Sequence, residues 1–272
     1  MKKYVILLLI CWSASQVLQA QGPPIMTDKP IMMGAGRSAI MTSVQHRANE
    51  MLRFTYIPVM FHHDFSDNFE LSFMPSVVFQ EQLENRISLG DLAIEAKYQF
   101  LRKDAVGRTF RMATRARQVF PTGKNFRTFD LGLGAWQTNF AVVGGIESLK
   151  YGLQGELGYT FIYAEKNPEN NGEIMPNMLE AKLGFGLPLL KPTYPVNQLN
   201  LYFEYEGVYM TGFLHNGIHD YGAQYGIYFA QGIQYAIKQW TIDFSVQVPL
   251  SQEMPEHMAR KVNVLSGFRF IF

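Results

Sequence analysis

Charged residues at alternating positions are the clearest chemical signal in this sequence. Arg111, Arg115 and Arg117 share one side of an extended chain, whereas on an α-helix they would not share a face. Glu95 and Lys97 alternate in the same way in the preceding apolar segment. We therefore expect two paired strands that place these charges in a cross-strand ladder.

More inward-facing charges are expected along the rest of the chain. Charges in a low-dielectric interior must pair or contact water, so such a lining either selects solutes in a pore or stabilises a packed, closed interior. Glu180 and Lys182 belong to the same inward rows. The candidate lumen-lining residues are Glu95, Lys97, Arg111, Arg115, Arg117, Glu156, Glu204, Glu206, Asp243 and Arg269.

Residues for other chemistry are sparse. Imidazoles occur as the pairs His62 and His63 and His215 and His219, but no regular spacing points to a metal site. The motifs GxSxG, HExxH and the P-loop are absent from the sequence, and no Ser and His are placed together on adjacent strand ends. We expect no catalytic residues, no metal and no cofactor, and hence no enzyme.

The composition excludes several classes of protein. The 272 residues are 47% hydrophobic, 14% aromatic and 17% charged, with 24 Lys and Arg against 23 Asp and Glu. This charge is too low and too balanced for a disordered chain or a nucleic-acid binder. Mean hydropathy is −0.06, which is low for a helical membrane protein that carries so many aromatic rings. A single Cys excludes a disulfide scaffold.

The N-terminus has the pattern of an export signal. Lys2 and Lys3 precede an apolar stretch at 4–12, and small residues follow, so we expect a signal peptide over 1–20. After it, no apolar run approaches the roughly 18 residues that a transmembrane helix needs. We expect 21–36 to be an N-terminal periplasmic or plug-like segment, and 37–272 to be one domain.

That domain reads as strands with a period of two. Each segment is about ten residues long, which suits a tilted strand that crosses a bilayer. Connections that are alternately short and long are typical of an outer-membrane barrel, although 47–50 and 188–198 break the trend. We predict an all-β, transmembrane antiparallel β-barrel of about 12 strands, with 10–14 possible. The expected strands are 37–46, 51–61, 69–79, 91–101, 109–120, 131–143, 151–163, 178–187, 199–206, 224–236, 240–248 and 262–272.

The C-terminus supports an outer-membrane location. The last segment ends in alternating aromatic residues at Phe268, Phe270 and Phe272. An aromatic final strand with a terminal Phe resembles the recognition signal of bacterial outer-membrane barrels. This implies outer-membrane lipid and the barrel-assembly machinery as partners, the latter through the strand ending at Phe272, in a Gram-negative bacterium.

The stretch 111–145 carries a family resemblance. A strand ends in Phe-Pro-Thr-Gly-Lys at 120–124, and a glycine-bearing strand follows at 131–134. This is similar to the outer-membrane transporter-like β-barrel family named after the meta-pathway of phenol degradation. Physically, Pro121 stops the ladder and Gly123 allows the chain to turn. The resemblance implies a monomeric barrel that passes small molecules, including hydrophobic or aromatic compounds.

The sequence thus predicts a channel or transporter-like barrel for small molecules. A closed structural barrel whose outer loops bind a partner is the alternative, and an outer-membrane lipid hydrolase with a Ser and a His at its rim is the least favoured. The sequence does not name the solute or say whether 22–36 plugs the lumen.

Overall fold

The described part of the chain covers the barrel and a short segment before it. The computed structural model describes residues 25–48, 53–80, 86–123, 135–163, 173–174, 176–190, 197–211, 214–215, 218–219, 222–254 and 259–272. The predicted signal peptide, 1–20, lies outside the described residues.

Only strands, turns and irregular segments occur among these residues. In chain order the strands are β1 (Ser38–Ala48), β2 (Arg53–Ser66), β3 (Phe69–Met74), β4 (Ser76–Gln80), β5 (Arg86–Leu89), β6 (Leu92–Ala105), β7 (Arg108–Phe120), β8 (Trp136–Ser148), β9 (Gly152–Tyr163), β10 (Glu173–Ile174), β11 (Met178–Pro188), β12 (Asn197–Met210), β13 (Leu214–His215), β14 (Ile218–His219), β15 (Gln224–Ile237), β16 (Trp240–Glu253) and β17 (Val262–Ile271). No helix in the described residues is long and apolar enough to cross a membrane.

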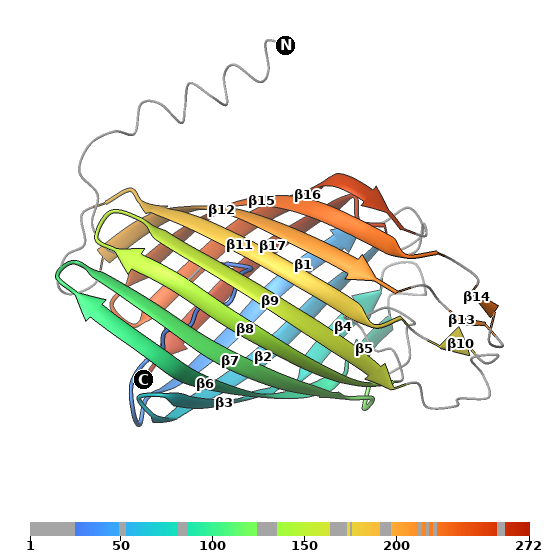
Figure 1. Cartoon of the computed structure of the whole chain (residues 1–272), viewed down its shortest axis with the longest axis horizontal. Coiled ribbons are helices and arrows are strands. Elements are labelled where there is room, and N and C mark those ends of the chain that lie inside the picture. Colours follow the sequence, from blue (N-terminus) through green and yellow to red (C-terminus); the bar gives the residue numbers. More distant parts are fainter. Residues whose placement is uncertain are drawn as a thin grey trace, which may run out of the picture.

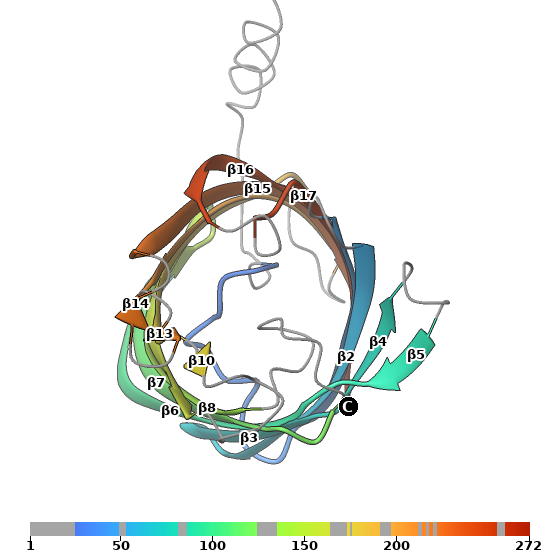
Figure 2. The same cartoon turned by 90° about the vertical axis from the view of Figure 1, so that its right-hand side faces the viewer.

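The strands close into a single antiparallel barrel. The long strands pair with their neighbours along the chain, and β1 pairs with both β2 and β17, which completes the ring (Figure 2). Among the described residues β5 pairs only with β4, and β10, β13 and β14 form a separate small sheet. Two of the twelve barrel strands are interrupted: β3 and β4 are separated at Pro75, and β5 and β6 at Gly90 and Asp91. The predicted all-β barrel of about 12 strands is confirmed.

The two ends of the barrel differ. We call the end that carries Phe272 and the tight turns the C-terminal end, and the opposite end, beyond which β10, β13 and β14 lie, the loop end (Figure 1). The turn between β6 and β7 is only Val106 and Gly107, and Gly107 has φ +71°, a conformation that glycine adopts without strain.

Several predicted strand boundaries are corrected by the structure. The predicted turns at 102–108 and 144–150 are mostly strand, because β6 and β7 and then β8 and β9 remain paired almost to the turn itself. The predicted strands end too early because charged residues such as Arg102 and Lys103 interrupt the alternation of apolar residues there. Backbone pairing continues through these charged residues. The predicted strand 131–143 begins at Trp136 in the described residues.

The barrel is apolar outside and polar inside. On β9, Glu156 and Thr160 are buried, whereas Leu157 and Phe161 are exposed on the outer surface. This alternation is the strand period of two, with one row facing lipid and the other the lumen. The interior is therefore a polar surface that must satisfy its own hydrogen bonds, and the N-terminal segment 25–34 lies within it (Figure 2).

Candidate functional site

The N-terminal segment 25–34 is fixed to the inner wall by its backbone. The Glu204 carboxylate, in the middle of β12, accepts hydrogen bonds from the N–H groups of Ile25 (3.0 Å), Met26 (3.0 Å to each oxygen) and Thr27 (2.6 Å). Glu204 and Thr27 are both buried. Hydrogen bonds to a charged acceptor are roughly twice as strong as neutral ones, so this carboxylate anchors the start of the segment.

Asp28 is the second anchor. Its Oδ1 lies 2.8 Å from Lys97 Nζ and its Oδ2 lies 3.3 Å from Arg115 Nη1. Its own N–H donates to Glu156 Oε2 at 3.1 Å. Burial alone would raise the pKa of Asp28, but the adjacent Lys97 and Arg115 cations hold it below its usual range. Asp28 therefore stays ionised at neutral pH and bridges Lys97 of β6 and Arg115 of β7.

The cluster continues along the wall on both sides of Asp28. Arg115 Nη2 lies 2.6 Å from Glu156 Oε1, and Arg117 Nη2 lies 2.7 Å from Glu95 Oε2. Lys97 also lies 3.7 Å from Glu70 Oε1. Because removing one partner of a buried ion pair costs about 3–5 kcal/mol, the cluster is sensitive to any single loss.

The far end of segment 25–34 is held at the C-terminal end of the barrel. Lys29 Nζ lies 2.7 Å from Glu147 Oε1. The Gly34 N–H donates to Asp64 Oδ2 at 2.8 Å, and the Gly36 N–H donates to the Asp64 carbonyl at 2.7 Å. Contacts thus run from the middle of the lumen to the start of β1, and they hold the segment against the wall along its length.

The predicted ladder of three arginines forms only in part. Arg117 and Arg115 lie opposite Glu95 and Lys97 in the β6–β7 register. Arg111 does not join them. It lies four residues from Arg115 along β7, opposite Arg102, and its Nη1 donates to Gln99 Oε1 at 3.3 Å.

The other candidate lining residues lie elsewhere on the inner wall. Glu206 binds Arg260 Nη1 at 2.9 Å, and Lys182 Nζ lies 3.8 Å from Glu180 Oε1. Asp243 and Arg269 line the same cavity nearer the C-terminal end. The structure therefore brings together Glu95, Lys97, Arg115, Arg117 and Glu156, and segment 25–34 connects this group to Glu204 on β12.

Sequence reasoning missed the residues that complete these contacts. Asp28 lies in a segment without periodicity. Arg260 lies in the connection between the predicted strands 240–248 and 262–272, where it binds Glu206 and stacks at 4.5 Å over the Tyr228 ring. Glu70 lies in the predicted strand 69–79 but was not selected. Only Glu70 had a usable signal, because it alternates with Ser72 and Met74 on one face.

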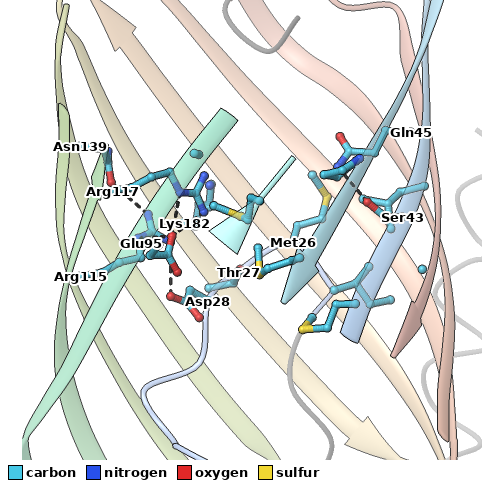
Figure 3. Close-up of a pocket in the computed structure, with 18 of the residues that line it drawn as sticks. Met26, Thr27, Asp28, Ser43, Gln45, Glu95, Arg115, Arg117, Asn139 and Lys182 are labelled. Carbon is cyan, nitrogen blue, oxygen red and sulfur yellow. Dashed lines mark hydrogen bonds and ion pairs between the residues drawn. The ribbon is translucent and has the colours of Figure 1, made fainter. Parts of the chain in front are cut away.

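A cavity of about 470 Å³ runs beside segment 25–34. It is lined at the loop end by Arg47 and Met178, and at the C-terminal end by Met33 and Arg269. Figure 3 shows Asp28 beside Arg115 on one wall, while Ser43 and Gln45 of β1 lie across the cavity. The wall formed by β1, β2 and β3 mixes polar side chains, such as His62 and Glu70, with the apolar side chains of Met41, Tyr56, Pro58, Met60 and Met74.

The histidines form no metal centre in the described residues. His62 Nδ1 lies 2.9 Å from Glu70 Oε1 and 2.7 Å from Ser72 Oγ, and no group of three His, Cys, Asp or Glu that could hold a metal ion is found in this part of the chain. The side chains of His215 and His219 lie outside the described residues.

One Ser–His pair was not anticipated. Ser38 Oγ lies 2.8 Å from His63 Nδ1, at adjacent strand ends. A hydrolytic triad needs a third group that orients the imidazole. No carboxylate among the described residues hydrogen-bonds to the His63 ring, so the pair lacks that part.

No family model matches the sequence, and no curated protein sequence matches it. Solved structures do match its fold. The COG4313 outer membrane channel from Pseudomonas putida F1 has a TM-score of 0.70 at 12% identity, over 92% of this chain and 100% of that chain. The KdgM porin has a TM-score of 0.46 at 13% identity, over 86% of this chain and 99% of that chain. LpxR from Salmonella typhimurium has a TM-score of 0.48 at 10% identity, over 86% of this chain and 100% of that chain. None of these names carries the phenol meta-pathway, so that resemblance stays a prediction. The fold of this chain is that of an outer-membrane β-barrel, similar to the COG4313 channel.

Proposed function

We propose that this protein is an outer-membrane channel of a Gram-negative bacterium that gives small molecules passive passage, with segment 25–34 narrowing its lumen as a plug. The observation that carries the proposal is the cavity beside the segment. Its lining includes Arg47 near the loop end and Arg269 near the C-terminal end, so the space extends along most of the barrel axis. The similarity in fold to an outer-membrane channel supports the same function.

The lining of the cavity favours small, weakly polar solutes, including hydrophobic or aromatic ones. The carboxylates and cations around Asp28 bind one another, so they offer few free charges to a solute. The opposite wall offers thioethers at Met41, Met60 and Met74. Methionine side chains are flexible and polarisable, and they adapt to apolar ligands of different shapes.

The test is single-channel conductance in planar bilayers. Wild-type protein is compared with a variant that lacks residues 25–34 and with Arg115→Ala. We expect the deletion to raise the conductance, because it removes the chain that occupies the lumen. We expect Arg115→Ala to change the ion selectivity, because it leaves Asp28 and Glu156 without a cation between them. Heat-dependent migration in detergent gels checks that each barrel is folded.

The alternative is a closed barrel whose outer loops bind a partner. The many contacts of segment 25–34 with the wall favour the closed barrel, because they would also hold a segment that blocks the lumen permanently. If neither the wild type nor the deletion variant showed conductance or liposome swelling, the channel proposal would be refuted and the closed barrel would stand.

A further inference from the structure

Three methionine side chains form a row across the inner wall of the barrel. Met60 of β2 lies directly opposite Met41 of β1. On the other side of β2, Phe61 lies opposite Phe73 of β3, so the adjacent position places Met74 opposite Met60. Phe61 and Phe73 are exposed on the outer surface, whereas the three methionines line the lumenal cavity. The alternation along each strand therefore turns the three thioethers to the same side.

The row brings the three sulfur atoms close together. Directly opposite residues of an antiparallel pair have Cβ atoms about 4.5–5.5 Å apart, and methionine has rotatable bonds with which to bridge that gap. A row of this kind can simply fill the space between strands. Thioethers are also soft ligands, however, and soft ligands select Cu(I) among the metals that proteins bind.

A histidine on the same face supplies a fourth donor atom. His62 occupies the next inward position after Met60 on β2 and lines the same cavity. Its side chain is only 9% exposed, and its Nε2 has no hydrogen-bond partner among the described residues. A buried polar atom without a partner is rare and calls for an explanation. A bound metal ion provides one, because a neutral imidazole nitrogen is a common metal ligand.

The other ring nitrogen of His62 is fixed by a carboxylate. Nδ1 lies 2.9 Å from Glu70 Oε1 and 2.7 Å from Ser72 Oγ, and the Ser72 hydroxyl donates to the same carboxylate oxygen at 3.3 Å. Because a carboxylate only accepts hydrogen bonds, the ring proton lies on Nδ1 and Nε2 carries the lone pair. A histidine that binds a metal usually donates its other N–H to a carboxylate in this way.

The surrounding charges favour a monovalent ion. Glu70 supplies a negative charge beside His62, but Lys97 Nζ lies 3.7 Å from its Oε1. Arg269 of β17 lies opposite Met41 and lines the same cavity. The repulsion by these two cations is twice as large for a divalent ion as for a monovalent one. The charges and the soft ligands thus favour the same kind of ion.

We propose that the thioethers of Met41, Met60 and Met74 and the Nε2 atom of His62 bind one soft monovalent metal ion, Cu(I) or Ag(I), on the inner wall. His, Cys, Asp and Glu alone form no metal centre in the described residues, and the thioethers complete this one. The site goes beyond the proposed passage of small molecules. It also stands independently of that passage, because metal binding does not require an open channel.

The first test measures the affinity of the purified, full-length barrel for Cu(I) in detergent. Cu(I) is kept reduced by ascorbate and is shared between the protein and the coloured chelator bicinchoninate. We expect the wild type to bind one Cu(I) per barrel, and Met60→Leu to weaken binding about tenfold or more, because the middle thioether is lost. Met178→Leu is the matched control, since Met178 lines the same cavity but packs against Met210 and Tyr228.

Three results of this titration would overturn the proposal. They are no uptake of Cu(I) by the wild type, equal affinity loss in Met60→Leu and Met178→Leu, and binding of Zn(II) as tight as that of Cu(I). Heat-dependent migration in detergent gels shows that each variant is folded.

The second test identifies the ligands directly and needs no methionine variant. X-ray absorption at the copper edge is recorded on the wild type and on His62→Gln, each loaded with one equivalent of Cu(I). We expect sulfur neighbours and one imidazole nitrogen in the wild type, and sulfur neighbours without the imidazole in His62→Gln. A wild-type spectrum without sulfur, or a spectrum that His62→Gln leaves unchanged, would refute the site.

Discussion

Replacing Glu204 by Gln is the sharpest test of how the N-terminal segment is held. The substitution keeps the size and shape of the side chain and one acceptor oxygen. It replaces the second carboxylate oxygen by an amide –NH2, which cannot accept a hydrogen bond from the backbone N–H groups that this oxygen binds in the wild type. The bond to Thr27 at 2.6 Å and one to Met26 at 3.0 Å use that second oxygen. At least one charge-assisted hydrogen bond is lost, at about 1.5–3 kcal/mol. Since 1.4 kcal/mol is a factor of ten, the undocked population should rise about 10- to 150-fold.

The assay is the labelling rate of a buried cysteine on the segment. Met32 is 7% exposed, so Met32→Cys should react with a water-soluble thiosulfonate only when the segment leaves the wall. Glu206→Gln is the matched control, because it removes a charge from the same face of the same strand but its hydrogen bonds go to Arg260 and Gln247. If Glu204→Gln labelled at the wild-type rate, or Glu206→Gln accelerated labelling as much, the anchoring role of Glu204 would be refuted.

Three further predictions follow from the same contacts. Gly123→Ala should destabilise the folded barrel by about 1–3 kcal/mol, because its Cβ would overlap the Gly90 backbone. The urea midpoint measured on detergent gels should fall, and an unchanged midpoint would contradict this close packing of Gly123 against Gly90. Asp28 has a lowered pKa, so its contribution to docking is present above the ordinary Asp value of about 4 and is lost only as the pH falls below it. The difference in Met32→Cys labelling rate between the wild type and Asp28→Asn, corrected for thiol ionisation, should therefore be flat from about pH 5 to 8. Deletion of Phe272, which stacks 6.0 Å from Phe270, should lower the yield of assembled barrel in cells, and an unchanged yield would remove Phe272 from the assembly signal.

The barrel itself was predictable because its signal is local. Residues such as Glu156 and Leu157 on β9 face opposite sides, and that alternation is readable in any short window of the sequence. Backbone pairing then fixes neighbours along the chain. The positions of Arg115 and Arg117 beside Glu95 and Lys97 follow from that pairing alone.

The docked segment was not predictable because its contacts are long-range and its backbone is irregular. Asp28 meets Arg115 across 87 residues of sequence, and no period marks either partner. Arg111 stays outside the cluster for a simpler reason, since four residues of extended chain separate it from Arg115 along β7. The Pro-Thr-Gly turn at 121–123 is predicted from the sequence as the end of a strand, but its contacts with Gly90 and Asp91 are not, because only the fold brings these residues near.

The pairing of β1 with β17 has a consequence for how the molecule is made. This seam joins the two ends of the chain, with Ala39 opposite Ile271, so the ring cannot close until the last strand exists. Segment 25–34 directly precedes β1 and is already bound to β6, β7, β9 and β12, all of which come before β17 in the chain. The order of events that requires no threading is docking first and closure second. On that order, segment 25–34 lies against β6, β7, β9 and β12 before the β1–β17 seam forms.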